Sequence, residues 1–334
     1  MAKTTSSPKR RASAKRREPA RAGRKASPPS DAPARRPPPR FAAEQFNRIV
    51  SRILEQQNFE TIEEANEFLE KNVNSRTVDE LMAGYEPEPE EVAQDLVYEA
   101  MGAEDLEETL DLLGRALKLD PDNIDALSML AGFAAENEED LVKSYASIVE
   151  RAAGRLGAAF IRENKGHFWG IPETRPYMRA RASLVSALRK AGRLDEAIGH
   201  CEAMLELNPN DNQGMRDILL GLYLQTDRLE GARRLFKKYR ESFFAIFNWA
   251  KVLERYLSGD LEGAKAAYVH ADAENRYVRD YLTGKKAPPK SPPDYYSPGD
   301  RNEACVCMAE IGHAWRSHPE ALEWLRGLQP AGKQ

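Results

Sequence analysis

Apolar residues recur at intervals of three and four along most of the chain beyond residue 40, and this spacing predicts amphipathic helices. The clearest example is residues 177–211, where two apolar stripes follow one another. Gly192 separates the stripes and can adopt the left-handed backbone conformation with which many helices end. Pro209 stops the second stripe, because proline disfavours helical geometry in the residue before it. We therefore predict a helical hairpin with its turn at Gly192.

The turn sequence that begins the second stripe recurs further along the chain. It places Ala197, Ala232 and Ala264 at equivalent positions, 35 and 32 residues apart. A hairpin of about 34 residues with a small residue where its helices meet resembles a tetratricopeptide repeat. Because one hairpin cannot bury its own apolar faces, the recurrence predicts an all-α, tetratricopeptide-like solenoid of stacked hairpins, with an irregular hairpin at 124–162. An ordinary helical bundle would share the spacing but not the recurring turn.

Four regions can be distinguished along the chain. Residues 1–40 are basic, rich in proline and poor in apolar side chains, so we expect a disordered tail. Residues 41–85 are predicted to form an N-terminal helical cap, and residues 86–285 the tetratricopeptide-like repeat array. Residues 286–334 are predicted to comprise a proline-rich connector and C-terminal capping helices, because the ends of a solenoid need atypical elements.

The net charge of −4 conceals a division between these regions. Residues 1–40 carry thirteen Lys or Arg and two acidic residues, a net charge of +11, which leaves −15 for the rest of the chain. Such a tail can bind nucleic acid or another polyanion without sequence preference by neutralising phosphates. The composition equally fits a solubilising tail without a specific partner. A transit peptide is a third reading, although the prolines would interrupt its amphipathic helix.

The cysteine content and hydropathy bear on location. Cys201, Cys305 and Cys307 are an odd number, which fits a reducing compartment better than a disulfide framework. The chain has no apolar run long enough to cross a bilayer, and its N-terminal residues lack the apolar core of a secretory signal. We therefore expect a cytoplasmic protein without a membrane span, and the pattern leaves the oligomeric state open.

No arrangement of side chains in the sequence predicts catalysis. The five histidines lie apart, without the spacing of zinc-protease or nucleophile-elbow motifs, and no glycines form a phosphate-binding loop. A metal site that combines Cys307, Glu310 and His313 is a weak candidate. We therefore predict no enzyme activity, no metal site and no cofactor.

In a solenoid of this kind the first helix of each hairpin lines the inner groove, so the repeat register assigns candidate binding residues. With Met178 at the first position, the groove residues are Arg179, Ser186, Arg189, Lys190, Gln213, Arg216 and Tyr223. Their basic members would hold an acidic segment or a free carboxylate of a partner through charge-assisted hydrogen bonds. The same positions would also suit a solvated face with ion pairs along each helix.

Two aromatic segments offer another binding edge. Its candidate residues are Phe168, Trp169, Arg175, Tyr295 and Tyr296, which lie in segments interrupted by glycine or proline. Aromatic side chains in such segments either pack beneath the next helix or are displayed for a partner, and packing is the more frequent outcome.

Several of these stretches carry a resemblance to a known family. They are Phe168-Trp169, the residues from Glu173 to Ala180, those from Leu207 to Gly214, and Asp294-Tyr295-Tyr296. Over residues 90–328 the chain resembles bacterial members of the suppressor of tumorigenicity 7 family. The resemblance implies tetratricopeptide-like architecture without an established catalytic activity. The animal members are predicted to be anchored in a membrane near the N-terminus, where this chain has a basic tail.

Two functions from different classes fit these observations. The first is a non-catalytic scaffold that binds a partner peptide or protein in the concave groove. The alternative is a nucleic-acid-associated assembly protein, in which the tail binds polyanions and the solenoid assembles the complex.

Overall fold

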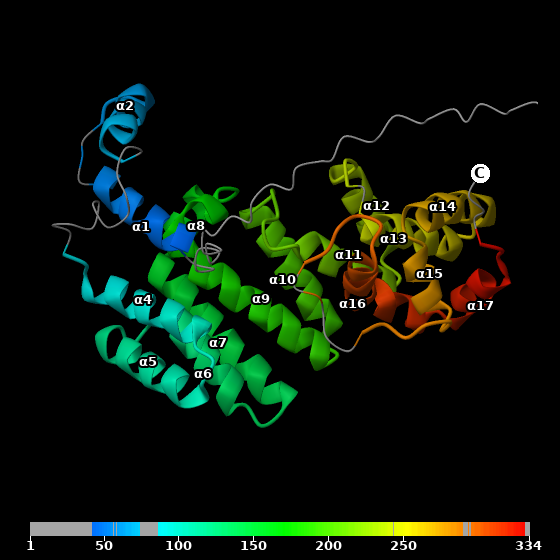
Figure 1. Cartoon of the computed structure of the whole chain (residues 1–334), viewed down its shortest axis with the longest axis horizontal. Coiled ribbons are helices and arrows are strands. Elements are labelled where there is room, and N and C mark those ends of the chain that lie inside the picture. The colour runs from blue at the N-terminus through cyan, green and yellow to red at the C-terminus, as the bar shows by residue number, and fades with distance from the viewer. Residues whose placement is uncertain are drawn as a thin grey trace, which may run out of the picture. The chain divides into compact units, whose positions relative to one another are not determined.

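The computed structural model describes residues 42–55, 57, 59–73, 86–242, 244–289, 293 and 295–330, all of which belong to one compact unit, Pro39–Gln334. Within these ranges every regular element is a helix, which confirms the all-α prediction (Figure 1). The predictions for the basic tail, for residues 74–85 and for part of the proline-rich connector lie outside the described residues.

Helical hairpins account for most of the described chain. The paired helices are α4 (Pro89–Gly102) with α5 (Leu106–Leu119), α6 (Ile124–Ala134) with α7 (Glu138–Leu156), α9 (Arg175–Lys190) with α10 (Leu194–Leu207), α11 (Met215–Gln225) with α12 (Leu229–Lys238), and α13 (Ala245–Leu257) with α14 (Leu261–Glu274). Neighbouring pairs also touch, because α7 packs on α9 and α10 on α11. We call the surface formed by the first helices, α4, α6, α9, α11 and α13, the first-helix face.

The turns of three successive hairpins share one backbone conformation. Gly192, Asp227 and Gly259 all have positive φ angles, of 73°, 57° and 78°. The amide that follows each donates a hydrogen bond to the carbonyl five residues before it, at 2.8 to 3.0 Å. This bond is a mark of the Schellman motif, which satisfies carbonyls at the end of a helix. The structure confirms the predicted turn at Gly192, and it places an aspartate where the other two hairpins have glycine.

The small residues that follow these turns are fully buried. Ala197, Ala232 and Ala264 each have 0% exposure, as expected where the two helices of a hairpin approach closely. Phe247 and Trp249 of α13 are also part of the core, since their side chains are at most 1% exposed. The ring of Trp249 lies 6.4 Å from that of Trp315, edge to face, and so joins α13 to the C-terminal helices.

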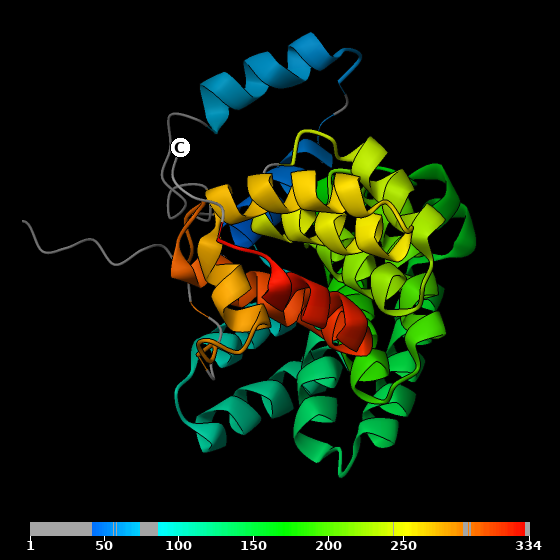
Figure 2. The ribbon, with the colours of Figure 1, turned by 90° about the vertical axis from the view of Figure 1, so that its right-hand side faces the viewer.

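The C-terminal helices pack on the hairpins rather than beyond them. They are α15 (Arg276–Leu282), α16 (Arg301–Ser317) and α17 (Pro319–Gly327), and α16 contacts both α11 and α13 (Figure 2). Helices α11 and α16 cross at Gly221, where an added Cβ would lie 2.2 Å from the carbonyl oxygen of Glu310. Part of the first-helix face is therefore covered by the chain itself.

The N-terminal helices are α1 (Ala42–Glu55) and α2 (Ile62–Asn72). Ile49 of α1 and Val73 are buried in a small apolar cluster with residues of both helices. On its other side α1 meets α4, through an ion pair between Arg48 and Asp95. Two short helical turns, η1 (Phe168–Gly170) and η2 (Pro172–Thr174), and the short α8 (Ala158–Glu163) connect α7 to α9.

Candidate functional site

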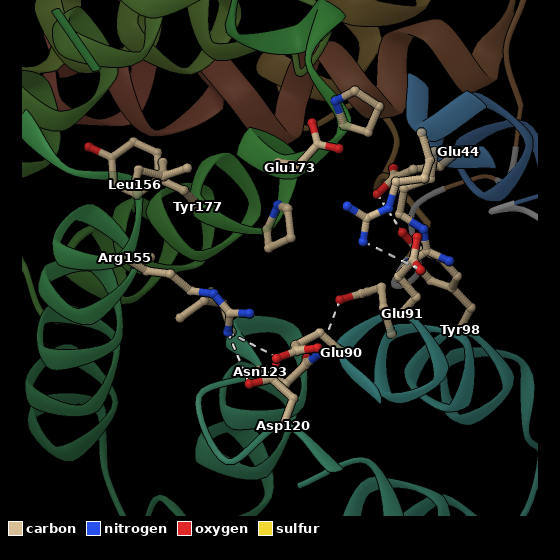
Figure 3. Close-up of a pocket in the computed structure, with 17 residues that line it drawn as sticks. Glu44, Glu90, Glu91, Tyr98, Asp120, Asn123, Arg155, Leu156, Glu173 and Tyr177 are labelled. Carbon is tan, nitrogen blue, oxygen red and sulfur yellow. Dashed lines mark hydrogen bonds and ion pairs between the residues drawn. The ribbon is translucent and has the colours of Figure 1, made fainter. Parts of the chain in front are cut away.

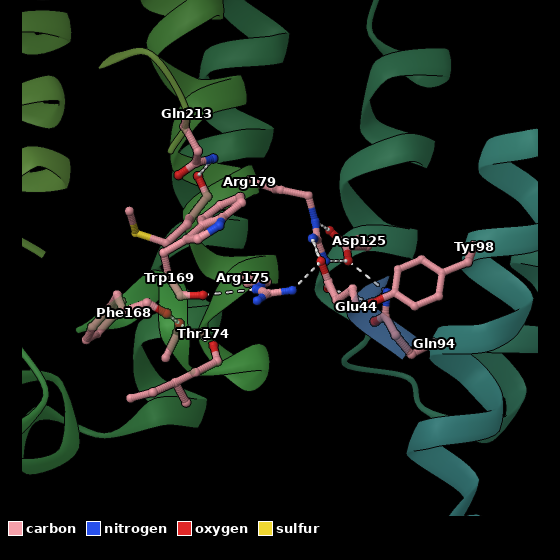
Figure 4. Close-up of polar contacts among 12 residues, drawn as sticks. Glu44, Gln94, Tyr98, Asp125, Phe168, Trp169, Thr174, Arg175, Arg179 and Gln213 are labelled. Carbon is pink, nitrogen blue, oxygen red and sulfur yellow. Dashed lines mark hydrogen bonds and ion pairs between the residues drawn. The ribbon is translucent and has the colours of Figure 1, made fainter. Parts of the chain in front are cut away.

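Arg179 of α9 binds two carboxylates at once. Its Nε and Nη2 donate to Asp125 at 2.9 and 2.5 Å, and its Nη1 donates to both oxygens of Glu44 at 3.0 Å (Figure 4). Asp125 lies at the start of α6, and Glu44 lies on α1. The guanidinium therefore joins the N-terminal helix to two hairpins of the first-helix face.

Further side chains complete this polar network. Tyr98 donates to Glu44 at 2.6 Å, and Gln94 donates to Asp125 at 2.9 Å. Asn123 donates to Gln94 at 3.2 Å and caps α6 by accepting from the amide of Ala126. A buried polar group is costly unless it forms hydrogen bonds. Here Tyr98 and Gln94 supply hydrogen bonds to the carboxylates of Glu44 and Asp125.

Burial makes the charges of the network strongly dependent on one another. Glu44 is 8% exposed and Asp125 2% exposed. Burial opposes the charge of Arg179, but Asp125 and Glu44 outweigh it and raise the pKa of Arg179 above its ordinary value. Burial and the neighbouring Glu44 raise the pKa of Tyr98 as well, so its hydroxyl stays protonated. In this arrangement the carboxylate of Glu44 is held by Arg179, Arg175 and Tyr98.

Arg175 extends the site towards the aromatic segment. Its Nη1 lies 3.4 Å from Glu44, its Nε donates to the carbonyl of Trp169 at 3.1 Å, and its guanidinium lies over the Trp169 ring at 5.4 Å. Trp169 is half-buried. Phe168 is fully buried and packs edge to face on Tyr177. Phe168 therefore belongs to the core and not to an exposed edge, which corrects that part of the predicted binding edge.

A cleft of about 380 Å³ lies beside Glu44 and opens between α1, α4, α7 and the start of α9 (Figure 3). Its charged walls carry Arg155, which donates to both oxygens of Asp120 at 3.0 Å, across the cleft from Glu44 and Tyr98. Its apolar lining includes Leu156 and Tyr177. The cleft therefore presents apolar and charged side chains within one surface.

The remaining groove residues differ in exposure and in the contacts they make. Ser186 and Lys190 are exposed, whereas Arg189 is half-buried and donates to Glu310 of α16 at 3.2 Å. Gln213 donates to the carbonyl of Met178 at 3.4 Å. Arg216 stacks over Tyr239 at 5.1 Å.

Tyr223 corrects the predicted register. It is 5% exposed, and its hydroxyl donates to Glu202 of α10. Its ring faces Gly231 of α12, where an added Cβ would lie 2.8 Å from three ring carbons. Tyr223 therefore fills the space where α10, α11 and α12 meet, because Gly231 of its own hairpin has no side chain to exclude the ring. It does not face a groove.

The tyrosines of the second aromatic segment differ in exposure. Tyr295 is 77% exposed, whereas Tyr296 is 42% exposed and packs edge to face on Phe244. Both side chains are exposed, and Tyr295 has the larger exposed fraction.

Glu44, Asp125, Tyr98 and Gln94 were not among the residues that the sequence singled out. Each lies on a different helix from Arg179 and is separated from it by at least 54 positions in the sequence. Helical spacing reports which side of its own helix a residue occupies, but not which distant helix faces that side. The buried position of Asp125, two residues after the capping Asn123, gives no distinguishing signal in the sequence.

Comparison with known proteins found no matching family model, no matching curated protein and no matching solved structure. In the part of the chain that the structure describes, no three His, Cys, Asp or Glu residues are arranged to hold a metal ion. Among the helices of the same ranges, none combines the length and the apolar composition needed to cross a bilayer.

Proposed function

We propose that the protein is a non-catalytic interaction scaffold of tetratricopeptide-like hairpins that binds a helical partner segment on its first-helix face. The observation that carries this proposal is the docking of α1. This helix lies outside the hairpin array, yet Glu44 inserts a carboxylate between Arg175 and Arg179, beside Tyr98 of α4. The chain thus contains one example of the contact that a partner would make.

The chemistry of the site favours an acidic residue on an amphipathic helix. The fork of Arg179 holds Asp125 by two parallel hydrogen bonds, and its remaining Nη1 and the Nη1 of Arg175 approach the carboxylate of Glu44. Charge-assisted contacts of this kind favour a carboxylate over a neutral group at this place. The cleft beside Glu44 supplies apolar surface for the rest of the segment. A partner helix would replace α1 or extend its contact into this cleft, as in other helix-in-groove complexes.

A synthetic α1 peptide, residues 42–55, tests the proposal. It should bind a full-length Glu44→Ala variant, whose own α1 lacks the competing carboxylate, more tightly than it binds the unmodified protein. The matched control is the same peptide with Glu44→Gln, which keeps the size of the side chain but removes the charge and replaces one acceptor oxygen by an NH₂ donor. We expect at least tenfold weaker binding of the control, since a charge-assisted pair contributes about 1.5–3 kcal/mol. Equal affinity of the two peptides would refute recognition of a carboxylate here.

The division of charge supports a second candidate function, a nucleic-acid-associated assembly protein. Residues 1–40 have a net charge of +11 on a body of −15, so a polyanion would be attracted to the tail alone. The two functions are compatible, because they use different parts of the chain.

The cysteines support the proposed cytoplasmic location. Cys201, Cys305 and Cys307 are all buried and unpaired. Burial raises the pKa of Cys201 to about 12, so this thiol stays protonated and unreactive. The relationship to the suppressor of tumorigenicity 7 family stays a prediction from the sequence.

A further inference from the structure

A second cavity, of about 950 Å³, lies far along the chain from the α1 site. It is bounded by the end of α14, by α15, by the turn at 285–286 and by the start of α16. Five basic residues line it: Arg276, Arg279, Lys285, Lys286 and Arg301. Three acidic residues, Asp272, Glu274 and Asp280, share its walls. The lining therefore carries two more positive than negative charges.

Three of the cations gather around one aromatic ring. The guanidinium carbons of Arg276 and Arg301 lie 5.5 and 5.2 Å from the ring centre of Tyr277, and the ammonium of Lys286 lies 5.9 Å from it. They come from α15, from α16 and from the turn after α15. Tertiary folding, and not a run of basic residues, brings these charges together.

The carboxylates of the cavity neutralise only part of this charge. Asp280 pairs with both Lys285 and Lys286, at 3.4 Å each. Among the described residues neither Arg276 nor Arg301 forms an ion pair with a carboxylate. A cation over an aromatic ring at an exposed site gains only about 0.5–1 kcal/mol, and like charges held together repel. Both guanidiniums contact the Tyr277 side chain, and since each carries five N–H donors, donors remain for an anion beside this ring.

Arg279 adds a further unused donor. Its Nη2 donates to the carbonyl of Leu328 at 2.7 Å, which fixes the side chain at the cavity wall. Its Nε is buried and has no hydrogen-bond partner. A buried donor without an acceptor is costly, so an acceptor supplied by a ligand would be stabilised there.

We propose that this cavity binds a phosphate group, with Arg276, Arg301 and Lys286 as its principal donors and Tyr277 at its base. A phosphate monoester carries close to two negative charges at neutral pH, which matches the excess of the lining. Its oxygens can accept from two guanidinium forks and an ammonium together, whereas a carboxylate offers two oxygens and one charge. The source is either a small phosphorylated molecule or a phosphorylated side chain of a partner.

Calorimetric titration of the full-length protein tests this proposal. Inorganic phosphate is the first probe, and a short phosphoserine peptide with its unphosphorylated form is the second. The double variant Arg276→Gln, Arg301→Gln should bind each phosphorylated probe at least tenfold more weakly. The matched control is Arg326→Gln, which removes an exposed arginine paired with Glu323 on α17, outside the cavity. The basic tail is identical in all these proteins and cannot produce a difference between them.

The outcomes separate the sources and the site. Tighter binding of the phosphopeptide than of inorganic phosphate assigns a partner side chain, and the reverse assigns a small molecule. Equal affinities of the double variant and the unmodified protein would refute the proposal, as would an equal loss in Arg326→Gln. An Arg301→Lys variant keeps the charge but loses the guanidinium fork. Its affinity for phosphate should lie between those of the unmodified protein and the double variant, and it serves as a second test in case the double variant misfolds.

Ionisation of Tyr277 gives a readout confined to the cavity. Hydrogen bonds and charge from Arg276 and Arg301 lower the pKa of Tyr277. A bound dianion opposes this effect, so phosphate should raise the pKa of this tyrosine. The difference between absorbance titrations of the unmodified protein and of Tyr277→Phe isolates its contribution. Phosphate that binds without changing this titration would be bound elsewhere, and the assignment to the cavity would fail.

Discussion

At the scale of single residues, folding pairs charged side chains that lie far apart in the sequence. Arg179 lies between two buried carboxylates, and Arg189 reaches Glu310 on α16. Both arginines were predicted to line the groove and to bind a carboxylate of a partner. Instead each is paired within the chain, so changing either one alters folding as well as binding.

Replacement of Arg179 by methionine should destabilise the protein strongly. The variant keeps an unbranched apolar stem but leaves Glu44 and Asp125 buried without their shared cation. Removing one partner of a buried ion pair costs about 3–5 kcal/mol. Urea unfolding measures the change. The control, Arg193→Met, removes an exposed arginine that pairs with Glu139 and Glu196, and should change stability little. Similar midpoints for the two variants would contradict the network described above.

Asp217 should make stability depend on pH in an identifiable way. Burial, together with Asp211 and Glu310, raises the pKa of Asp217 from 3.8 to about 7, although Arg216 opposes the shift. Between about pH 4 and pH 7 the unfolded chain therefore binds fewer protons at this residue than the folded protein, and stability falls as pH rises. The carboxylate is charged and poorly solvated in the folded protein above pH 7.

Asp217→Asn removes this cost and should be the more stable protein at pH 8. The gain should be on the order of a few kcal/mol, since each tenfold change in proton affinity corresponds to about 1.4 kcal/mol. The difference should shrink as pH falls to about 4 and vanish below the ordinary pKa of 3.8, where the carboxyl is protonated in both the folded and the unfolded state. Thermal melts across this range measure it. A constant difference from pH 4 to pH 8 would show that Asp217 does not titrate in this window.

At the scale of elements, helices and turns follow closely from local sequence, whereas docking of helices does not. The left-handed turn at Gly192 follows from glycine's freedom at positive φ, and the structure repeats it at Asp227 and Gly259. Apolar spacing also identified α16 and α17. By contrast, the contact of α16 with α11 joins residues about 90 positions apart, and no local pattern encodes it.

The candidate site shows the same limit. The arginines were found because the repeat register places them on the first-helix face. Their carboxylate partner Glu44 was missed because its approach depends on the docking of a separate helix. Tyr223 was misplaced because helical spacing alone does not distinguish a face that meets a neighbouring hairpin from one that meets solvent.

Gly221→Ala should test the crossing of α11 and α16. In an exposed helix this change is stabilising by about 0.5–1 kcal/mol, but here the new methyl group would lie 2.2 Å from the Glu310 carbonyl oxygen. Overpacking of this kind costs about 1–3 kcal/mol or more. Gly199→Ala on α10 is the matched control, because nothing lies within 4 Å of its added Cβ. Chemical denaturation should show opposite signs for the two variants, and a stabilised Gly221→Ala would place α16 elsewhere.

At the scale of the whole molecule, segments outside the hairpins occupy the first-helix face. Helix α1 contacts α4 and α9 through Glu44, and α16 contacts α11 and α13. A partner for this face must therefore compete with the chain itself. A partner should displace α1 more readily than α16. Helix α16 is joined to α13 by the buried rings of Trp249 and Trp315, whereas α1 is held by ion pairs of Glu44 and Arg48.

The division of charge predicts binding of polyanions that depends steeply on salt. Thirteen cations in residues 1–40 would displace counterions from DNA or RNA, and the acidic remainder of the chain would add repulsion. If six phosphates are neutralised, affinity should fall about a thousandfold between about 50 and 200 mM salt. Fluorescence anisotropy with labelled oligonucleotides of different sequence measures this slope. Affinities should be alike across sequences, and removal of residues 1–40 should abolish binding, while capture of the α1 peptide by the Glu44→Ala variant persists. A full-length protein that ignores nucleic acid at about 50 mM salt would limit the tail to solubility or targeting and leave the scaffold as the sole binding function.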